Sequence, residues 1–328
     1  MLDGITVLDL SSVGPGSRCT WLLADLGADV VKIVAPPSAG RIDPPFHSYG
    51  AGRGTRRTEI DLKTNKDAFL DLAADADVVV ESYRPGVADR LGIGYDAVRA
   101  RNPTIVYAAI TGYGQTGPMA SWAGHDVNYL GVAGLLAAQG NALAGATVAD
   151  SAGGGMQAAI SILAALLRRD RTGEGAYLDV STTNGVLYLM ALQIDQYLAT
   201  GEESAPGTTL LTGRYACYGV YECRDGKWLS VAAIESQFFH NLCRALECEQ
   251  LAEHQYDDKQ QDEIRATFAA TFATKNRDDW VAELAPLDTC VAPVLDVSEV
   301  ASRFPELVQE ATHPEHGSFE QLGPLIAR

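Results

Sequence analysis

Several patterns typical of secreted or membrane-bound proteins are absent from this chain. It has no stretch of about 18 consecutive apolar residues, the length that a helix needs to cross a bilayer. Its six cysteines contain no C-x-x-C pair, and a chain of this size needs no disulfide framework. The opening MLDGITVLDLSS carries two acids where a signal peptide has basic residues and an apolar run. We therefore expect a cytoplasmic protein with reduced thiols and no membrane partner.

Positive charge is scarce as well. Lys and Arg total 25 against 42 Asp and Glu, and the resulting net charge of −17 repels nucleic acids and anionic membranes. Any phosphate group must therefore bind in a local basic pocket. Three basic clusters follow expected strands, where open α/β sheets bind ligands, although each alone is an ordinary solvated surface feature. The clusters are Arg53 with Arg56 and Arg57, Lys63 with Lys66, and Arg84 with Arg90.

Motifs for nucleotide hydrolysis and for metal binding are missing too. No G-x-x-x-x-G-K-[ST] segment occurs, and no histidine pairs at helical ligand spacing with a suitable carboxylate. The segment from Gly112 to Gly117 has the G-x-G-x-x-G spacing and follows an expected strand. Pro118 and a short segment stand where a dinucleotide site needs a long apolar helix. This segment therefore predicts a tight turn, and we expect neither a bound metal nor a cofactor.

An alternation of apolar strands and helices fills residues 1–200. Such an alternation indicates a mostly parallel sheet covered on both faces, hence an α/β domain. The expected strands are Ile5–Leu10, Asp29–Val34, Val78–Val80, Thr104–Ile110 and Tyr177–Val180. The expected helices are Thr20–Leu26, Ala68–Ala73, Tyr95–Arg101, Asn128–Ala138, Gly155–Arg169 and a last one that runs to about Ala199.

The pattern changes after the polar segment Gly201–Thr209, whose composition is typical of a linker. The segments Tyr215–Cys223 and Trp228–Ile234 flank a D-G turn signal and predict a hairpin. Helices are expected near Glu235–Leu246, Asp262–Ala273 and Asp278–Leu284. We therefore expect a large domain at residues 1–200, a linker at 201–212 and a smaller α+β domain at 213–300.

Two short segments carry groups suited to acid/base chemistry. His125 and Asp126 follow Gly124, and Asp150 stands ahead of the glycine run Gly153–Gly155. Asp150 has the position of a helix N-cap, and a lone histidine is commonly a structural residue. Three successive glycines weaken a helix start, so something should need the backbone to come close, and amides there can stabilise an oxyanion. The residues alone go no further than an acid/base pair beside an anion-stabilising helix, with the capping interpretation left open.

Several longer segments occur in one order along nearly the entire chain. They are LDGITVLDLSSVGPG, LADLGADVVKI, RGTRRTEIDLK, ESYRPGVADRLGIGY, NPTIVYAAITGYGQTGP, AGHDVNYLGVAGLL, ADSAGGG, RTGEGAYLDVS, YECRDGKW and AIESQFF. As an ordered set they closely resemble the family III CoA transferases (CaiB/BaiF type), and within them the α-methylacyl-CoA racemases. No single segment is specific, whereas the whole set is.

This resemblance implies an interlocked homodimer that acts on an acyl-CoA thioester and needs no further cofactor. Each subunit would have a large Rossmann-like domain and a smaller α+β domain, and the active site would lie between the large domain of one chain and the small domain of the other. Asp150 matches the family's catalytic aspartate and His125 the racemase histidine. Glu235 matches the glutamate that pairs with that histidine, and Tyr218 a tyrosine of the same pocket. Contacts to CoA are implied for Val13, Leu62, Lys63, Tyr83, Arg90 and Asp126.

The implied chemistry is 1,1-proton transfer on a 2-methylacyl-CoA through an enolate. Inverting a carbon beside a thioester carbonyl requires two acid/base groups that flank it, here His125 and Asp150. We expect the amides of Gly153–Gly155 to stabilise the enolate oxygen. Glu235 would orient the imidazole and favour its charged form.

Two other functions stay open. A CoA transferase would use Asp150 as a nucleophile and has no need of His125, and a catalytically silent homologue would only bind acyl-CoA. Ala35 stands where the family usually has a CoA-gripping arginine, which Arg41 or Arg53 would have to replace. The returning linker expected at residues 301–328 is shorter than in the family. Which acyl group is bound stays open: a branched fatty acyl, a bile-acid-like and a 2-arylpropionyl group all fit this chemistry.

Overall fold

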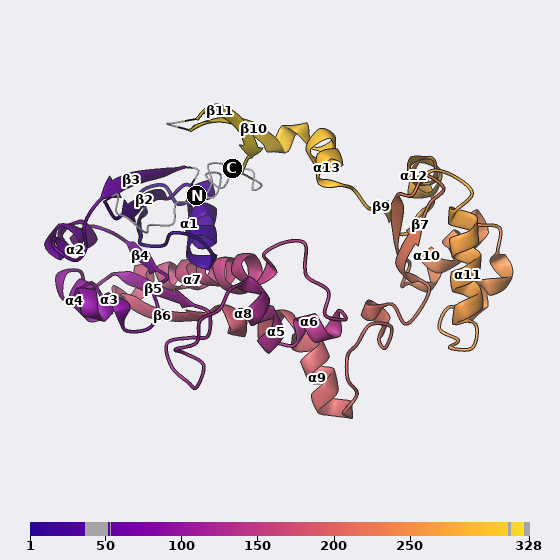
Figure 1. The fold of residues 1–328 in the computed structure, drawn as a ribbon, viewed down its shortest axis with the longest axis horizontal. Coiled ribbons are helices and arrows are strands. Elements are labelled where there is room, and N and C mark those ends of the chain that lie inside the picture. Colours follow the sequence, from indigo (N-terminus) through magenta and orange to yellow (C-terminus); the bar gives the residue numbers. More distant parts are fainter. Residues whose placement is uncertain (37–51, 53, 314–315, 325–328) are drawn as a thin grey trace. The chain divides into compact units, whose positions relative to one another are not determined.

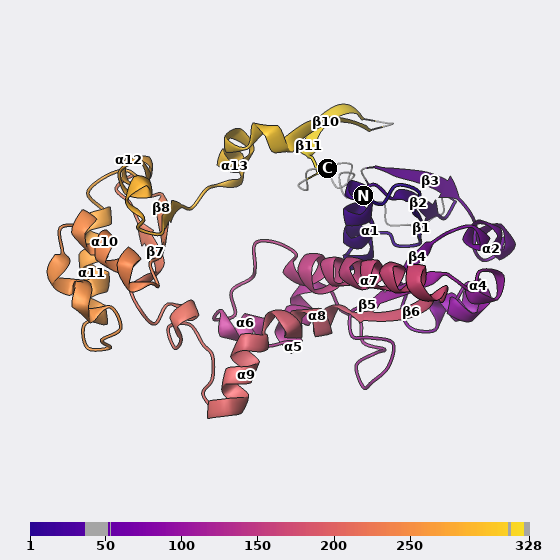
Figure 2. The ribbon, with the colours of Figure 1, turned by 180° about the vertical axis from the view of Figure 1, so that it is seen from behind.

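The computed structural model describes residues 1–36, 52, 54–313 and 316–324. The chain divides into two compact units, whose elements are labelled in Figure 1 and, from behind, in Figure 2. The first unit comprises Met1–Leu136, Leu143–Ile194 and Glu306–Arg328, and the second comprises Ala137–Ala142 and Asp195–Pro305.

The first unit contains a six-stranded sheet in the order β3-β2-β1-β4-β5-β6, in which every neighbouring pair is parallel. The strand order reverses between β1 and β4, which is the arrangement of a Rossmann-like sheet. The expected α/β class is therefore confirmed. The strands are β1 (Thr6–Asp9), β2 (Asp29–Val34), β3 (Thr55–Glu59), β4 (Val78–Glu81), β5 (Val106–Thr111) and β6 (Ala176–Ser181).

Helices cover both faces of this sheet (Figures 1 and 2). Side chains of a parallel strand alternate between the faces, so Val7 of β1 belongs to one core cluster and Leu8 to the other. The cluster of Val7 also contains residues of α1 (Pro15–Asp25) and α7 (Gln157–Thr172). The cluster of Leu8 contains residues of α2 (Lys66–Ala74), α3 (Val87–Leu91) and α4 (Tyr95–Arg101).

The segment between β5 and α7 differs from the expectation. The helix expected at Asn128–Ala138 is divided into α5 (Asp126–Val132) and α6 (Leu135–Ala138), because Gly134 has a positive φ of 84° between them. The expected start of the next helix at Gly155 is wrong: a π-helix, η2 (Ala149–Met156), precedes α7 without a break. After β6 the chain continues into the helices α8 (Thr182–Leu189) and α9 (Ala191–Thr200).

The second unit has a three-stranded sheet in the order β7-β8-β9, in which both pairs are antiparallel. The expected hairpin is confirmed, with Tyr218 of β7 opposite Ala232 of β8. Its core is rich in aromatic residues, including Phe239, Phe268 and Trp280. The elements are η3 (Leu210–Thr212), β7 (Tyr218–Glu222), β8 (Trp228–Ala232), α10 (Ser236–Ala245), η4 (Glu249–His254), α11 (Gln261–Phe272), α12 (Arg277–Leu284), η5 (Ala285–Leu287), β9 (Val291–Pro293) and α13 (Val297–Arg303).

The chain then returns to the first unit through η6 (Pro305–Leu307) and the antiparallel pair β10 (Val308–His313) and β11 (Gly317–Leu322). Among the described residues, no helix combines the length and the apolar composition that a membrane span needs.

Candidate active site

Five residues singled out in the sequence follow the carboxyl ends of strands in the first unit. Because the strands are parallel, these ends meet at one edge of the sheet, where α/β folds bind ligands. Val13 follows β1 and Tyr83 follows β4, so the two lie on either side of the point where the strand order reverses. Leu62 and Lys63 follow β3, and His125 follows β5.

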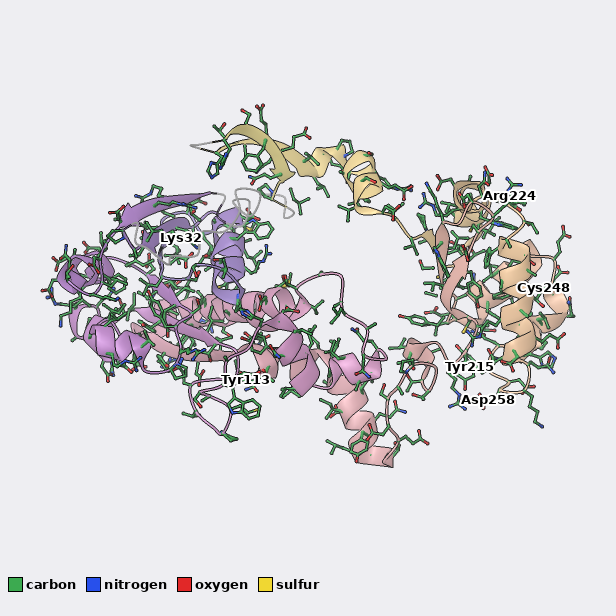
Figure 3. All side chains as sticks on the ribbon, viewed as in Figure 1. Lys32, Tyr113, Tyr215, Arg224, Cys248 and Asp258 are labelled. Carbon is green, nitrogen blue, oxygen red and sulfur yellow. The ribbon has the colours of Figure 1, made fainter. Side chains whose placement is uncertain are left out.

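The loop after β1 is anchored by a buried ion pair that the sequence reading missed. Asp9 is fully buried and accepts a hydrogen bond of 2.8 Å from Nζ of Lys32, which is 8% exposed. Lys32 is labelled in Figure 3. The same carboxylate accepts bonds from the N–H and hydroxyl of Ser11 and from the hydroxyl of Thr20. A buried charge needs such partners. The two strands place Asp9 at the end of β1 opposite Lys32 within β2. An acid and a lysine in neighbouring apolar strands were therefore the available signal.

Asp150 lies at the start of η2, close to the loop after β1. A Cβ on Gly14 would lie 3.6 Å from Oδ2 of Asp150. Gly14 has a φ of 76°, a conformation that side chains rarely adopt, so both its backbone and its neighbour favour glycine. The N-cap interpretation of Asp150 is wrong, because Val148 occupies that position and Asp150 is the second residue of the helix. Its carboxylate is therefore not used in capping η2.

Asp126 links the two acid/base candidates. The N–H of Asp150 donates a hydrogen bond of 2.8 Å to Oδ1 of Asp126. Asp126 is the first residue of α5 and His125 is its N-cap, whose N–H donates to Oδ1 of Asn128 at 3.0 Å. The structure therefore brings His125, Asp126 and Asp150 together in the first unit, with the imidazole exposed and Asp150 half-buried.

The charges around Asp150 change its acidity. Burial and then the Asp126 carboxylate raise the pKa of Asp150 above its usual value, while Arg18 and His125 lower it by less. Arg18 belongs to α1 and also lies over the ring of Trp21, 5.5 Å from its centroid. A carboxyl group with a raised pKa is a better proton acceptor and donor near neutral pH than an ordinary aspartate.

The glycine run Gly153–Gly155 does not lie at a helix start. A Cβ on Gly153 would lie 2.8 Å from the carbonyl oxygen of Thr182, and one on Gly154 would lie 2.4 Å from Cβ of Pro15. A Cβ on Gly155 would lie 2.7 Å from Cβ of Arg18. The run lies inside η2, where its members allow close packing against α1 and α8. The glycines therefore bring the backbone of η2 close to two other helices. The assignment of their amides to the enolate oxygen stays a prediction.

Aromatic residues hold the loop that carries His125. The hydroxyl of Tyr129 donates to the carbonyl oxygen of Gly124 at 2.6 Å, and its ring packs edge-on against Tyr113. Burial and then the Asp150 charge raise the pKa of Tyr129 to about 12, so this hydroxyl stays protonated. The segment Gly112–Gly117 is a series of bends after β5, and the N–H of Gln115 donates to the carboxylate of Asp179 on β6.

The residues implied in CoA binding keep exposed surface around the strand ends. Lys63, Arg84 and Arg90 are exposed, and none of these three makes an ion pair with a described residue. Leu62 packs against the core cluster, and Val13 is 54% exposed. Of the other basic residues, Arg56 is occupied by a bidentate pair with Asp29, and Arg57 has a partner of its own. Arg41 and Arg53 lie outside the described residues.

Two predicted site residues belong to the second unit. Tyr218 opens β7, and Glu235 is the N-cap of α10, directly after β8. Because Tyr218 is paired with Ala232, both side chains come from the same end of the hairpin. Tyr218 is half-buried and Glu235 is exposed. Their assignment to the pocket of His125 stays a prediction.

Within the part of the chain that the structure describes, no group of three or more His, Cys, Asp or Glu side chains is arranged to hold a metal ion.

Comparisons with known proteins agree over nearly the full length. The family model described as CoA-transferase family III matches residues 2–327. Human alpha-methylacyl-CoA racemase is 34% identical over 97% of this chain and 82% of that protein. The acetyl-CoA:oxalate CoA-transferase of Acetobacter aceti is 30% identical over 92% of this chain and 82% of that protein. The crystal structure of a CAIB/BAIF family protein from Brucella suis is 28% identical, with a TM-score of 0.79 over 95% of this chain and 89% of that chain.

Proposed function

The chain belongs to CoA-transferase family III, and from this premise we propose that it is a racemase or epimerase of 2-methylacyl-CoA thioesters. The observation that supports the proposal is that His125 lies near Asp150: its neighbour Asp126 accepts a hydrogen bond from the N–H of Asp150, and the His125 charge acts on the Asp150 carboxyl group. A transferase needs the aspartate alone. Proton transfer between two faces of one carbon needs both groups.

In the proposed reaction one of the two groups removes the proton on carbon 2 and the other returns a proton to the opposite face. The electron pair of the broken C–H bond moves into the carbonyl, which gives an enolate. Asp150, with its raised pKa, is suited to the carboxylate half of this exchange. His125 provides the second group, and its exposed ring is accessible to substrate. The carboxylate of Glu235 would orient that imidazole.

We assign the CoA moiety to the edge where the parallel strands end, and we propose no cofactor beyond the CoA that the substrate carries. Lys63 and Arg90 would bind its phosphates, because both are exposed and have no acidic partner among the described residues. We also assign Asp126 to the CoA contacts. It has a structural role as well, because its Oδ1 accepts a hydrogen bond from the N–H of Asp150. The remaining assigned contacts are Val13, Leu62 and Tyr83.

We also propose that the active form is a homodimer, as in the family resemblance. Large apolar side chains on α7 to α9 are exposed to an extent unusual in a monomer, with Leu167 at 61%, Tyr188 at 75% and Leu198 at 74%. A second copy would cover such surface. In such a dimer, Tyr218 and Glu235 of one copy would complete the active site of the other copy. Sedimentation at several concentrations would measure the state directly.

The test is deuterium incorporation from heavy water. Incubation with a 2-methylacyl-CoA should introduce label at carbon 2 and interconvert the two configurations. The His125→Ala and Asp150→Asn variants should lose interconversion by about 10²-fold or more. No label above a buffer control, over a panel of branched fatty acyl, bile-acid-like and 2-arylpropionyl thioesters, would rule out the racemase proposal.

The second candidate is CoA transfer, favoured by the similarity to the Acetobacter enzyme. Here the Asp150 carboxylate would attack the thioester carbonyl, CoA would leave as the thiolate, and a mixed anhydride would remain. Hydroxylamine would trap that intermediate on Asp150, while a racemase would show no trapping. A silent acyl-CoA-binding protein would bind thioester equally well after His125→Ala and Asp150→Asn and would turn over in neither form.

A further inference from the structure

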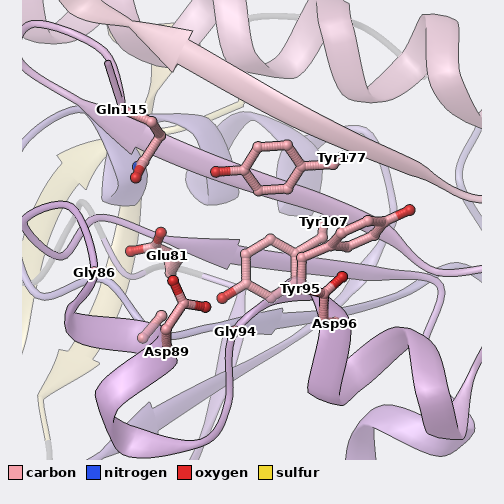
Figure 4. Close-up of a pocket in the computed structure, with 10 residues that line it drawn as sticks. Glu81, Gly86, Asp89, Gly94, Tyr95, Asp96, Tyr107, Gln115 and Tyr177 are labelled. Carbon is pink, nitrogen blue, oxygen red and sulfur yellow. The ribbon is translucent and has the colours of Figure 1, made fainter. Parts of the chain in front are cut away.

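A pocket lies in the first unit near the loop after β4 that carries Tyr83, on the α3–α4 side of the sheet. It encloses about 230 Å³ between the end of β4, the segment 86–96 and the strands β5 and β6. Figure 4 shows that the carboxylates of Glu81 and Asp89 and the hydroxyl ends of Tyr95 and Tyr177 face the same space. The proposed acid/base groups, His125 and Asp150, do not line it.

The acids of this pocket have no cationic partner among the described residues, although Glu81 is buried and Asp89 is exposed. Glu81 is only 4% exposed, and its one hydrogen bond among the described residues comes from the N–H of Tyr83, 2.6 Å from Oε2. Neither Glu81 nor Asp89 forms an ion pair within the described part of the chain. A buried carboxylate without a cation is costly unless a ligand provides one.

Aromatic rings form the opposite wall. The ring centroids of Tyr95 and Tyr177 are 5.2 Å apart, and they lie 6.0 and 6.1 Å, respectively, from the ring centroid of Tyr107. Tyr107 is buried and its hydroxyl donates to the carbonyl oxygen of Ile93 at 3.2 Å, which fixes the ring. The hydroxyl oxygens of Tyr95 and Tyr177 face the carboxylates, and together these oxygen atoms give the space a negative surface that attracts a cation.

One further group lacks a partner. The side-chain nitrogen Nε2 of Gln115 is buried at the pocket and has no hydrogen-bond partner among the described residues. A buried polar atom in this condition calls for a group that is not part of the chain. An oxygen atom on the ligand would accept its hydrogen bond.

We propose that this pocket binds a small organic ammonium ion that carries an oxygen atom. The positive nitrogen would lie between the carboxylates and the tyrosine rings, and the oxygen would face Gln115. A pocket of about 230 Å³ has room for a ligand of this size and is too small for a whole CoA molecule. The inference does not depend on the proposed racemase activity, because its test measures binding alone.

The charge of Glu81 gives the site a pH dependence. Burial first, and then the Asp89 charge, raise the pKa of Glu81 to about 7, against the opposing hydrogen bond from Tyr83. The site therefore holds its full negative charge only above neutral pH. If the cation requires ionised Glu81, its affinity should be about tenfold higher at pH 8 than at pH 6. The groups that face Glu81 are Asp89 of α3, Tyr83 after β4, Tyr107 of β5 and Tyr177 of β6.

The experiment measures choline binding to the full chain by calorimetry. Its neutral isostere 3,3-dimethylbutan-1-ol has the same shape without the charge. We expect choline to bind at least tenfold more tightly than the alcohol. Glu81→Gln should weaken choline at least tenfold and remove the pH dependence. Tyr177→Leu, at a position that is 43% exposed, should also weaken choline because it removes a hydroxyl that faces the acids. The control Asp170→Asn removes an exposed acid outside the pocket and should change nothing.

Three results would overturn the proposal. The first is equal affinity for choline and the alcohol, and the second is no binding of about 10 mM choline to the parent protein. The third is displacement of choline by KCl or MgCl₂ at matched ionic strength, which would show that the site binds inorganic cations. Thermal unfolding of each variant separates loss of binding from loss of the fold.

Discussion

Gly185→Ala would test the contact between η2 and α8 that places Asp150. A Cβ on Gly185 would lie 1.7 Å from the carbonyl oxygen of Gly153, a backbone atom that no side-chain rotation can move away. Alanine favours a helix over glycine by about 1 kcal/mol, whereas inserting an atom into a packed contact costs about 1–3 kcal/mol and more where backbone must shift. The clash should win, with a net loss of about 2 kcal/mol.

Urea unfolding followed by circular dichroism measures this loss, and Gly131→Ala provides the matched control. Gly131 also lies in a helix, α5, but its Cβ would meet only Cδ1 of Leu136 at 3.6 Å, an ordinary contact. We expect the control to be stabilised by up to about 1 kcal/mol. Because η2 carries Asp150, Gly185→Ala should also lower kcat. A Gly185→Ala variant as stable as the control would contradict the close approach of the two helices.

Three further changes follow from the site. Lys32→Met would leave Asp9 buried without its cation and should cost about 3–5 kcal/mol in urea unfolding, whereas an unchanged midpoint would show that the pair is not buried. Asp126→Asn keeps an acceptor for the N–H of Asp150 but removes the charge that raises the pKa of Asp150. The acidic limb of the plot of kcat against pH should therefore move to lower pH. An acidic limb that stays in place would contradict the coupling between Asp126 and Asp150. Arg90→Ala should raise the Kd for CoA several-fold and weaken its salt dependence while the fold melts normally, and an unchanged Kd would remove Arg90 from the phosphate site.

Most of the parallel sheet could be predicted because its strands are short apolar runs. Asp29–Val34 was located to the residue, and α4 likewise at Tyr95–Arg101. The edge strand β3 was missed, because Thr55–Glu59 is polar and mostly exposed on one side of the sheet and so lacks the apolar signal. The strands β10 and β11 were missed for a similar reason, since their residues are charged, polar or half-exposed.

The site was harder to predict because its geometry depends on contacts between distant segments. The sequence of a glycine run is the same whether its backbone approaches an anion or another helix. The neighbours of Gly153–Gly155, which lie on α1 and around the start of α8, become visible only in the folded chain. The hydrogen bond between Asp126 and Asp150 joins residues 24 positions apart and has no local signal. The Glu81 pocket was missed altogether, because its acids and tyrosines come from segments that only the folded sheet brings together.

The central claim is that His125 and Asp150 act on opposite faces of one carbon. The most direct measurement is deuterium exchange into each pure enantiomer of a 2-methylacyl-CoA by the His125→Ala and Asp150→Asn variants. Each variant should label only the enantiomer whose proton faces the remaining group, the two variants should prefer opposite enantiomers, and neither should invert the carbon. Variants that label both enantiomers equally, or that still invert them, would contradict the two-group account.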